Sequence, residues 1–223
     1  MNAEVNTAGP SQPMAGSSGY YKPQRWDFRL AKVISGVFSP PVVLVIAVVF
    51  IGVALNALSW SIIYVLSVII VPTLYVWWLL KSGRIKNFHM YERRERIKPN
   101  ALTLLLTILA WLGFKYTGAP PEFTLFAFVA IFEVAQLLLI TFFWKISIHS
   151  TSITGLSFFL VALFGWKVWY LLLAIPLVIW ARLRTDNHSF KQLLFGMLSG
   201  GGFIILVLAI ISFQCHGAGL ICE

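Results

Sequence analysis

Long apolar segments constrain this chain more than any other feature of its sequence. Seven of them occur, at roughly 41–58, 60–80, 101–117, 122–143, 149–165, 167–182 and 190–213. A helix rises 1.5 Å per residue, so about 20 residues, with about 17 tolerated, cross the hydrocarbon core of a bilayer. In lipid the backbone must satisfy its own hydrogen bonds, which favours helices. The sequence therefore predicts an all-α, polytopic transmembrane helical bundle with six or seven membrane segments, of which the fifth and sixth are short.

Composition excludes the main soluble classes. Hydrophobic residues make up 59% of the 223 residues and charged residues 11%, whereas a soluble domain is about 45–50% apolar and about 25% charged. A disordered chain and a soluble globular enzyme are therefore excluded. We expect a disordered N-terminal tail at 1–24, a membrane domain at 25–213 and a short C-terminal tail at 214–223. Residues 25–38 mix basic and apolar side chains as an interfacial helix does, and lead into Pro40-Pro41, which suits a first helical turn.

Basic residues are concentrated on one side of the predicted bundle. If every segment crosses, 15 of the 17 lysines and arginines lie on the face shared by the N-terminus and the loops after segments two, four and six. Cytoplasmic loops carry such an excess, so this face is predicted to be cytoplasmic. The net charge of +9 is therefore expected to lie in loops, where it reports orientation or binds an anionic ligand. We expect no nucleic-acid partner.

The three basic loops contain nearly all the residues capable of chemistry. The first spans Lys86 to Pro99 and includes Arg93 and Arg96, the second spans 144–150 and includes Lys145, Ser147 and His149, and the third spans 182–192 and includes Arg182, His188 and Gln192. Both histidines are expected near helix starts, with Asn187 as the N-cap before His188. Helix N-termini and arginines both favour phosphate oxygens.

The spacing within these loops resembles the three motifs of the type 2 phosphatidic acid phosphatase superfamily. Arg182, five residues, His188, three residues and Gln192 follow the spacing of its third motif, in which the last position is aspartate. Ser147 and His149 match the serine and histidine of the second motif. Lys86, six residues and Arg93 follow the first, although Arg94 replaces the motif's proline.

The resemblance implies a metal-independent hydrolase of lipid phosphates or diphosphates, with a prenyl or glycerolipid tail. His188 would attack phosphorus and His149 would protonate the leaving group. The expected phosphate-binding residues are Lys86, Arg93, Arg96, Lys145, Ser147 and Arg182. Phosphoryl transfer depends chiefly on positioning and charge neutralisation, which such a cationic site supplies. No cofactor or metal is expected, because the chain lacks acidic pairs at the spacing that holds Mg²⁺.

Two alternatives stay open. Gln192 stands where the family has the aspartate that orients the nucleophile. If His188 and Gln192 lie four apart on one helix, the amide can accept an imidazole N–H but cannot stabilise its positive charge. A slow enzyme, or a silent relative that binds anionic lipid or partners, is therefore the first alternative. The second is a transporter that uses Glu133 and Gln136, although an internal hydrogen bond of the glutamic acid explains that pair more simply.

Overall fold

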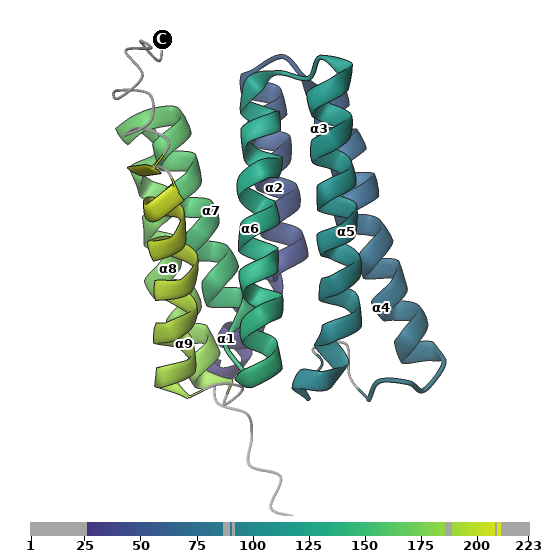
Figure 1. The fold of residues 1–223 in the computed structure, drawn as a ribbon. Coiled ribbons are helices and arrows are strands. Elements are labelled where there is room, and N and C mark those ends of the chain that lie inside the picture. The colour runs from purple at the N-terminus through teal and green to yellow at the C-terminus, as the bar shows by residue number, and fades with distance from the viewer. Residues whose placement is uncertain (1–25, 87–89, 91, 186–188, 208, 211–223) are drawn as a thin grey trace, which may run out of the picture.

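In a computed structural model of the chain, every described element is a helix. The structure describes residues 26–86, 90, 92–185, 189–207 and 209–210. The elements stand roughly side by side as a bundle (Figure 1). Their bounds are α1 Trp26–Val37, α2 Pro40–Ala54, α3 Leu58–Tyr64, η1 Val65–Ile70, α4 Val71–Lys81, α5 Arg93–Thr117, α6 Pro121–Phe143, α7 Ile148–Phe164, η2 Gly165–Leu173, α8 Ala174–Arg184, α9 Phe190–Met197 and η3 Leu198–Gly202.

Within the described ranges, five helical stretches are long and apolar enough to cross a membrane. They are Leu58–Lys81, Arg93–Thr117, Pro121–Phe143, Ile148–Arg184 and Phe190–Val207, and the bent pair of α1 and α2 makes a sixth if it is counted as one span. The prediction of an all-helical chain with several membrane-crossing helices is thereby confirmed.

Prolines and a glycine mark several helix boundaries, as their backbone chemistry requires. Pro40 and Pro41 occupy the first turn of α2, where a missing N–H costs nothing, as predicted. The chain bends by 49° between α1 and α2 just before them. Pro72 is the second residue of α4, just after the π-helical turn η1, and both features are known causes of bends in long helices. Gly118 ends α5 in the left-handed conformation, with φ of 77°.

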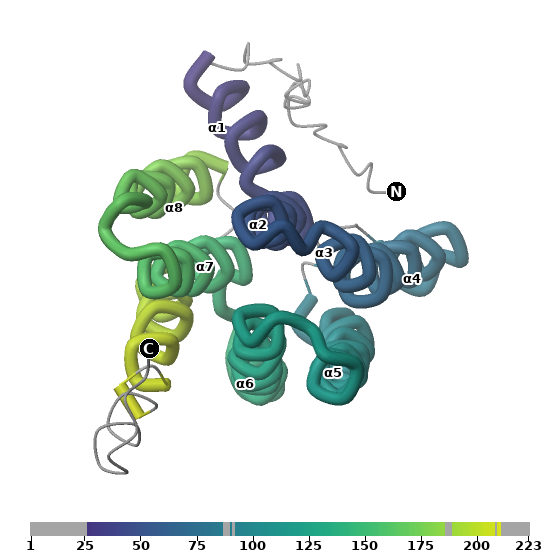
Figure 2. Tube along the Cα trace, turned by 90° about the horizontal axis from the view of Figure 1, so that it is seen from above, coloured from purple at the N-terminus to yellow at the C-terminus, as the bar shows by residue number. Residues whose placement is uncertain are grey.

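The stretch from Ile148 to Arg184 reverses direction within η2. Gly165 has φ of 73° and starts this 3₁₀ segment. The Ser157 hydroxyl on α7 donates a hydrogen bond to the Leu171 carbonyl, 3.2 Å away on η2. Consequently α7 and α8 lie side by side as a hairpin (Figure 2).

Glycines bring the last described helix very close to α7. A Cβ added to Gly196 would lie 2.8 Å from the Ser147 carbonyl oxygen, and one added to Gly200 would lie 2.2 Å from the Thr151 carbonyl oxygen. Glycine at both positions therefore permits the close packing of these two helices.

The connections that carry the sequence motifs lie at one end of the bundle. Figure 1 places the loop after α4, the loop between α6 and α7 and the start of α9 at its lower end, together with α1. The shared face predicted from the apolar segments is therefore present in the fold.

Candidate functional site

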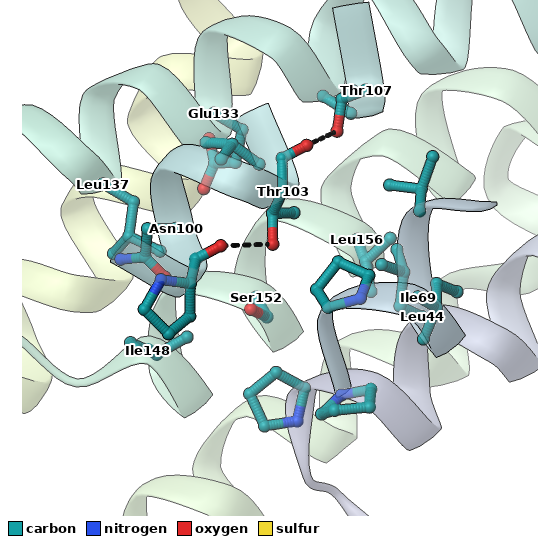
Figure 3. Close-up of a pocket in the computed structure, with 18 of the residues that line it drawn as sticks. Leu44, Ile69, Asn100, Thr103, Thr107, Glu133, Leu137, Ile148, Ser152 and Leu156 are labelled. Carbon is teal, nitrogen blue, oxygen red and sulfur yellow. Dashed lines mark hydrogen bonds between the residues drawn. The ribbon is translucent and has the colours of Figure 1, made fainter. Parts of the chain in front are cut away.

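A cavity of about 300 Å³ lies among α2, η1, α4, α5, α6 and α7. Three basic side chains line it at the motif-bearing end, namely Arg96, His149 and Arg182. Most of the remaining wall is apolar, with contributions from Leu44, Ile69 and Leu156 (Figure 3). The cavity therefore combines a cationic end with a lipophilic interior, which suits an anionic amphiphile.

Arg96 lies in the first turn of α5 and points back toward the loops. Its side chain is 5% exposed. The Nε donates a hydrogen bond of 2.7 Å to the Met90 carbonyl, and Nη1 donates one of 3.3 Å to the Ile146 carbonyl. Met90 has φ of 44°, an unfavourable conformation for methionine, and it presents the carbonyl that holds this guanidinium. Both acceptors are neutral, so neither bond neutralises the positive charge.

His149 is the second residue of α7, at the cavity end of that helix. It is 8% exposed. Ser147 is the N-cap, and its hydroxyl accepts a 3.4 Å hydrogen bond from the Ser150 backbone N–H. The prediction that His149 lies at a helix start is confirmed. Its imidazole is therefore placed beside the positive end of a helix dipole, which favours an anion there.

Arg182 approaches the cavity from the last turn of α8 and is 3% exposed. Its Nη1 donates a 2.8 Å hydrogen bond to the Ser35 hydroxyl on α1. Two residues further along α8, Arg184 forms an ion pair with the buried Asp27 of α1, with 3.6 Å between Nη1 and Oδ2. Helix α1 thus supports the basic end of α8, and through it the position of Arg182.

Lys145 adds a further cation close to these two arginines. Burial lowers the pKa of its ammonium, and the positive charges of Arg96 and Arg182 lower it further. Since like charges disfavour protonation only at short range, the effect places Lys145 in the same electrostatic neighbourhood. A bound anion at this end would relieve the mutual repulsion of the three side chains.

Hydrogen bonds connect the three motif-bearing segments directly. Arg96 joins the first to the second through the Ile146 carbonyl. The Ser147 N–H donates to the Gln192 carbonyl at 3.3 Å, and the Ser150 hydroxyl donates to the Leu193 carbonyl at 3.0 Å. Segments far apart in sequence therefore form one continuous structure at the cavity mouth.

Four of the six expected phosphate ligands do not line the cavity. Ser147 is fully buried as the N-cap of α7, and Lys145 is also absent from the cavity wall. The other two, Lys86 and Arg93, lie elsewhere. Lys86 is exposed and pairs with Glu92, with 3.4 Å between Nζ and Oε1. Arg93 is exposed, and its Nη1 donates to the carbonyls of Phe142 and Phe143 at 3.0 and 2.7 Å. Those carbonyls are left without helical partners at the end of α6. Neither residue lines the cavity, so the structure does not bring Lys86 or Arg93 to the cationic end.

The start of α9 differs from the expectation. Ser189, not Asn187, is the N-cap, and it forms a capping box with Gln192. The Ser189 N–H donates to the Gln192 Oε1 at 3.1 Å, and the Gln192 N–H donates to the Ser189 hydroxyl at 3.4 Å. Because α9 begins at Phe190, it does not provide the helical spacing assumed for residues 188 and 192. His188 and Asn187 lie outside the described residues.

Sequence reasoning did not single out several polar residues that line the cavity. Asn100, Thr103 and Thr107 follow Arg96 on α5 at separations of four, three and four, which is one face of a helix. Ser152 likewise follows His149 by one turn of α7. This spacing was available in the sequence and predicts that the polar stripe continues inward from each basic residue.

Glu133 also lines the cavity, and its environment is not the one expected. Gln136 donates from Nε2 to the carbonyl and the hydroxyl of Ser199. The two oxygens of Glu133 are buried and have no hydrogen-bond partner among the described residues. The prediction that Glu133 forms an internal hydrogen bond is therefore wrong for the residues that the structure describes.

Comparison with known proteins yields no relative for this chain. No protein-family model, curated protein or solved structure matches it. Among the described residues, no group of three or more His, Cys, Asp or Glu side chains is placed to hold a metal ion.

Proposed function

We propose that the protein is an integral membrane phosphatase that hydrolyses a lipid phosphate or diphosphate at the cationic end of this cavity. The observation that carries the proposal is the convergence of Arg96, His149 and Arg182 on one cavity. Each comes from a different predicted motif, and the motifs are far apart in the sequence. An anionic headgroup would neutralise the arginines while its tail occupies the apolar interior.

The chemistry follows the resemblance to the phosphatase family. A nitrogen of His188 attacks phosphorus, the P–O bond to the lipid breaks, and His149 donates a proton to the departing oxygen. Water then attacks the phosphohistidine, which releases inorganic phosphate and regenerates the imidazole. Arg96 and Arg182 stabilise the charge on the non-bridging oxygens during both steps, and no cofactor is required.

The proposal extends to topology. Counting α7 and α8 as two spans and α2 as one gives seven membrane segments, and counting the α7–α8 hairpin as one re-entrant element gives six. The motif-bearing end faces the cytoplasm because the basic residues are concentrated there. In this arrangement the substrate reaches the site from the lipid layer, with its headgroup at the membrane surface.

The test is phosphate release by the full chain in lipid nanodiscs, with EDTA present and with a glycerolipid phosphate and a prenyl diphosphate as substrates. We expect release from at least one substrate, and its loss in His149→Ala and His188→Ala. His216→Ala controls for removing a histidine outside the motifs. Arg182→Lys should lower kcat/KM, because lysine lacks the bidentate fork, whereas Arg184→Lys should not. The absence of release from every lipid phosphate, or full activity in His188→Ala, would refute the proposal.

Gln192 favours a second candidate function, that of a catalytically silent relative of the phosphatases that binds anionic lipid without turnover. The capping box makes Gln192→Glu the sharpest discriminating variant, since glutamate is also a normal N3 residue of this motif. Gln192→Glu should therefore preserve the start of α9 while supplying a carboxylate at the position where the phosphatase motif has aspartate. A higher rate identifies a handicapped enzyme. Lipid-phosphate binding without turnover in both wild type and variant identifies the silent relative.

A further inference from the structure

Polar side chains form a second group in the cavity, deeper than the cationic end. Figure 3 shows Asn100 and Thr103 of α5, Glu133 of α6 and Ser152 of α7 around the same space. All four line the cavity. They are embedded in spans that are otherwise strongly apolar, where polar groups are expensive and usually functional.

The depth of this group follows from helix geometry. Arg93 at the start of α5 bonds the Phe143 carbonyl at the end of α6, so these two helix ends lie level. Glu133 precedes Phe143 by ten residues, and Arg96 follows Arg93 by three. At 1.5 Å per residue, the backbone of Glu133 lies about 10 Å further into the bundle than that of Arg96.

Two members of this group have hydrogen-bonding capacity that the described part of the chain does not use. The amide nitrogen of Asn100 and both carboxyl oxygens of Glu133 are buried without a partner among the described residues. Neighbouring polar side chains, in contrast, have hydrogen-bond partners within the protein. The Thr103 hydroxyl donates to the Pro99 carbonyl at 2.9 Å, and Gln136, one turn from Glu133, bonds Ser199. Buried polar groups are nearly always paired, so two unpaired groups on one cavity indicate a ligand that pairs them.

We propose that Asn100 and Glu133 form a hydrogen-bonding subsite for a polar linkage between the phosphate and the hydrocarbon tail of the substrate. The Asn100 amide donates to an oxygen of this linkage. The Glu133 carboxyl either donates its own O–H to a second oxygen of an ester, or accepts from the O–H or N–H of a hydroxyl or amide. An ester, an amide or a hydroxyl satisfies the subsite. A lipid phosphate whose tail is hydrocarbon from its first carbon leaves both groups buried and unpaired. The inference rests on the proposed function for its phosphate end, and it selects acyl or hydroxylated lipid phosphates over prenyl and alkyl ones.

The experiment compares matched phosphate monoesters that share one tail length. One carries an ester without a hydroxyl, one a hydroxyl without an ester, one an amide, and one is a plain alkyl phosphate. We expect wild type to show kcat/KM at least about tenfold higher for one linkage-bearing probe than for the alkyl phosphate, a discrimination typical of buried hydrogen bonds. The preferred probe identifies the source of the linkage.

Variants then test whether the two residues create this preference. Glu133→Met and Asn100→Leu should each reduce the ratio toward one, chiefly by lowering kcat/KM for the linkage-bearing probe. Glu133→Gln should retain most of it, because the amide still forms hydrogen bonds. Gln136→Met is the matched control, since Gln136 lies on the same helix and bonds Ser199 instead, and it should leave the ratio unchanged.

Affinity of the same probes separates this inference from the proposed hydrolysis. It is measured in EDTA as the shift in thermal unfolding of the full chain. If no probe is hydrolysed but the linkage-bearing probe stabilises wild type and not Glu133→Met, the subsite stands and the hydrolase fails. If all probes are hydrolysed equally, and Glu133→Met and Asn100→Leu match wild type, the hydrolase stands and the subsite fails. Equal stabilisation by all probes without hydrolysis overturns both.

Discussion

Replacing Gly200 with alanine tests the closest helix contact in the structure. The added Cβ would lie 2.2 Å from the carbonyl oxygen of Thr151 and 3.1 Å from the backbone nitrogen of Gly155. Both atoms belong to the backbone of α7, so no side-chain rotation relieves the clash, and the two helices must separate by about 1 Å to restore van der Waals contact. Overpacking of this kind costs about 1–3 kcal/mol. We expect the upper half of that range, a change of about 30- to 150-fold in the unfolding equilibrium.

Gly202→Ala is the matched control, because nothing lies within 4 Å of its added Cβ. Alanine favours a helix over glycine by up to about 1 kcal/mol, so the difference between the two variants isolates the clash. The assay is reversible unfolding in mixed micelles by titration with a denaturing detergent. Equal stability of Gly200→Ala and Gly202→Ala would refute the close approach of η3 to α7.

Three further perturbations address the site and its supports. Arg93→Gln should lower the free energy of unfolding by about 1 kcal/mol, because the end of α6 loses its hydrogen bonds, without raising KM for a lipid phosphate. Ser35→Ala should lower both stability and phosphate affinity, since it removes the acceptor for Arg182 on α1. Gly36→Ala, in open space on the same helix, should lower neither. The pKa of Lys145 is lowered in the folded protein, so the free energy of unfolding should rise with pH between that pKa and the usual value of about 10.4. Lys145→Met should abolish this rise. Bound inorganic phosphate should shift the rise to higher pH.

The sequence predicted the helical class and the common face of the three loops correctly, for simple physical reasons. Apolar runs and prolines are local signals, and each marks where a membrane helix can begin or end. Alternation of crossing direction then places every second loop at the same end. The start of α7 at His149 was predicted on the same grounds, since a polar loop gives way to an apolar run at that point.

Local sequence signals did not predict which arginine of the first motif lines the cavity. Arg93 and Arg96 belong to one motif and lie less than one helical turn apart. The motif spacing favoured Arg93, yet this residue bonds the end of α6 while Arg96 turns toward Met90 and Ile146. Which one faces the cavity depends on how α5 packs against α6, a tertiary property that no spacing rule contains.

Glu133 illustrates the same limit inside the bundle. Glu133 and Gln136 are three residues apart, which is compatible with one shared hydrogen-bond network. Side chains on one helix face can nevertheless contact different helices, and then they have different partners. Gln136 meets η3 through Ser199, whereas Glu133 lies against Gly155 of α7, whose added Cβ would come within 3.4 Å of its Oε1. The missing side chain at Gly155 leaves room beside the carboxyl. The cavity therefore leaves the Glu133 carboxyl without a partner among the described residues, and the proposed ligand would supply one.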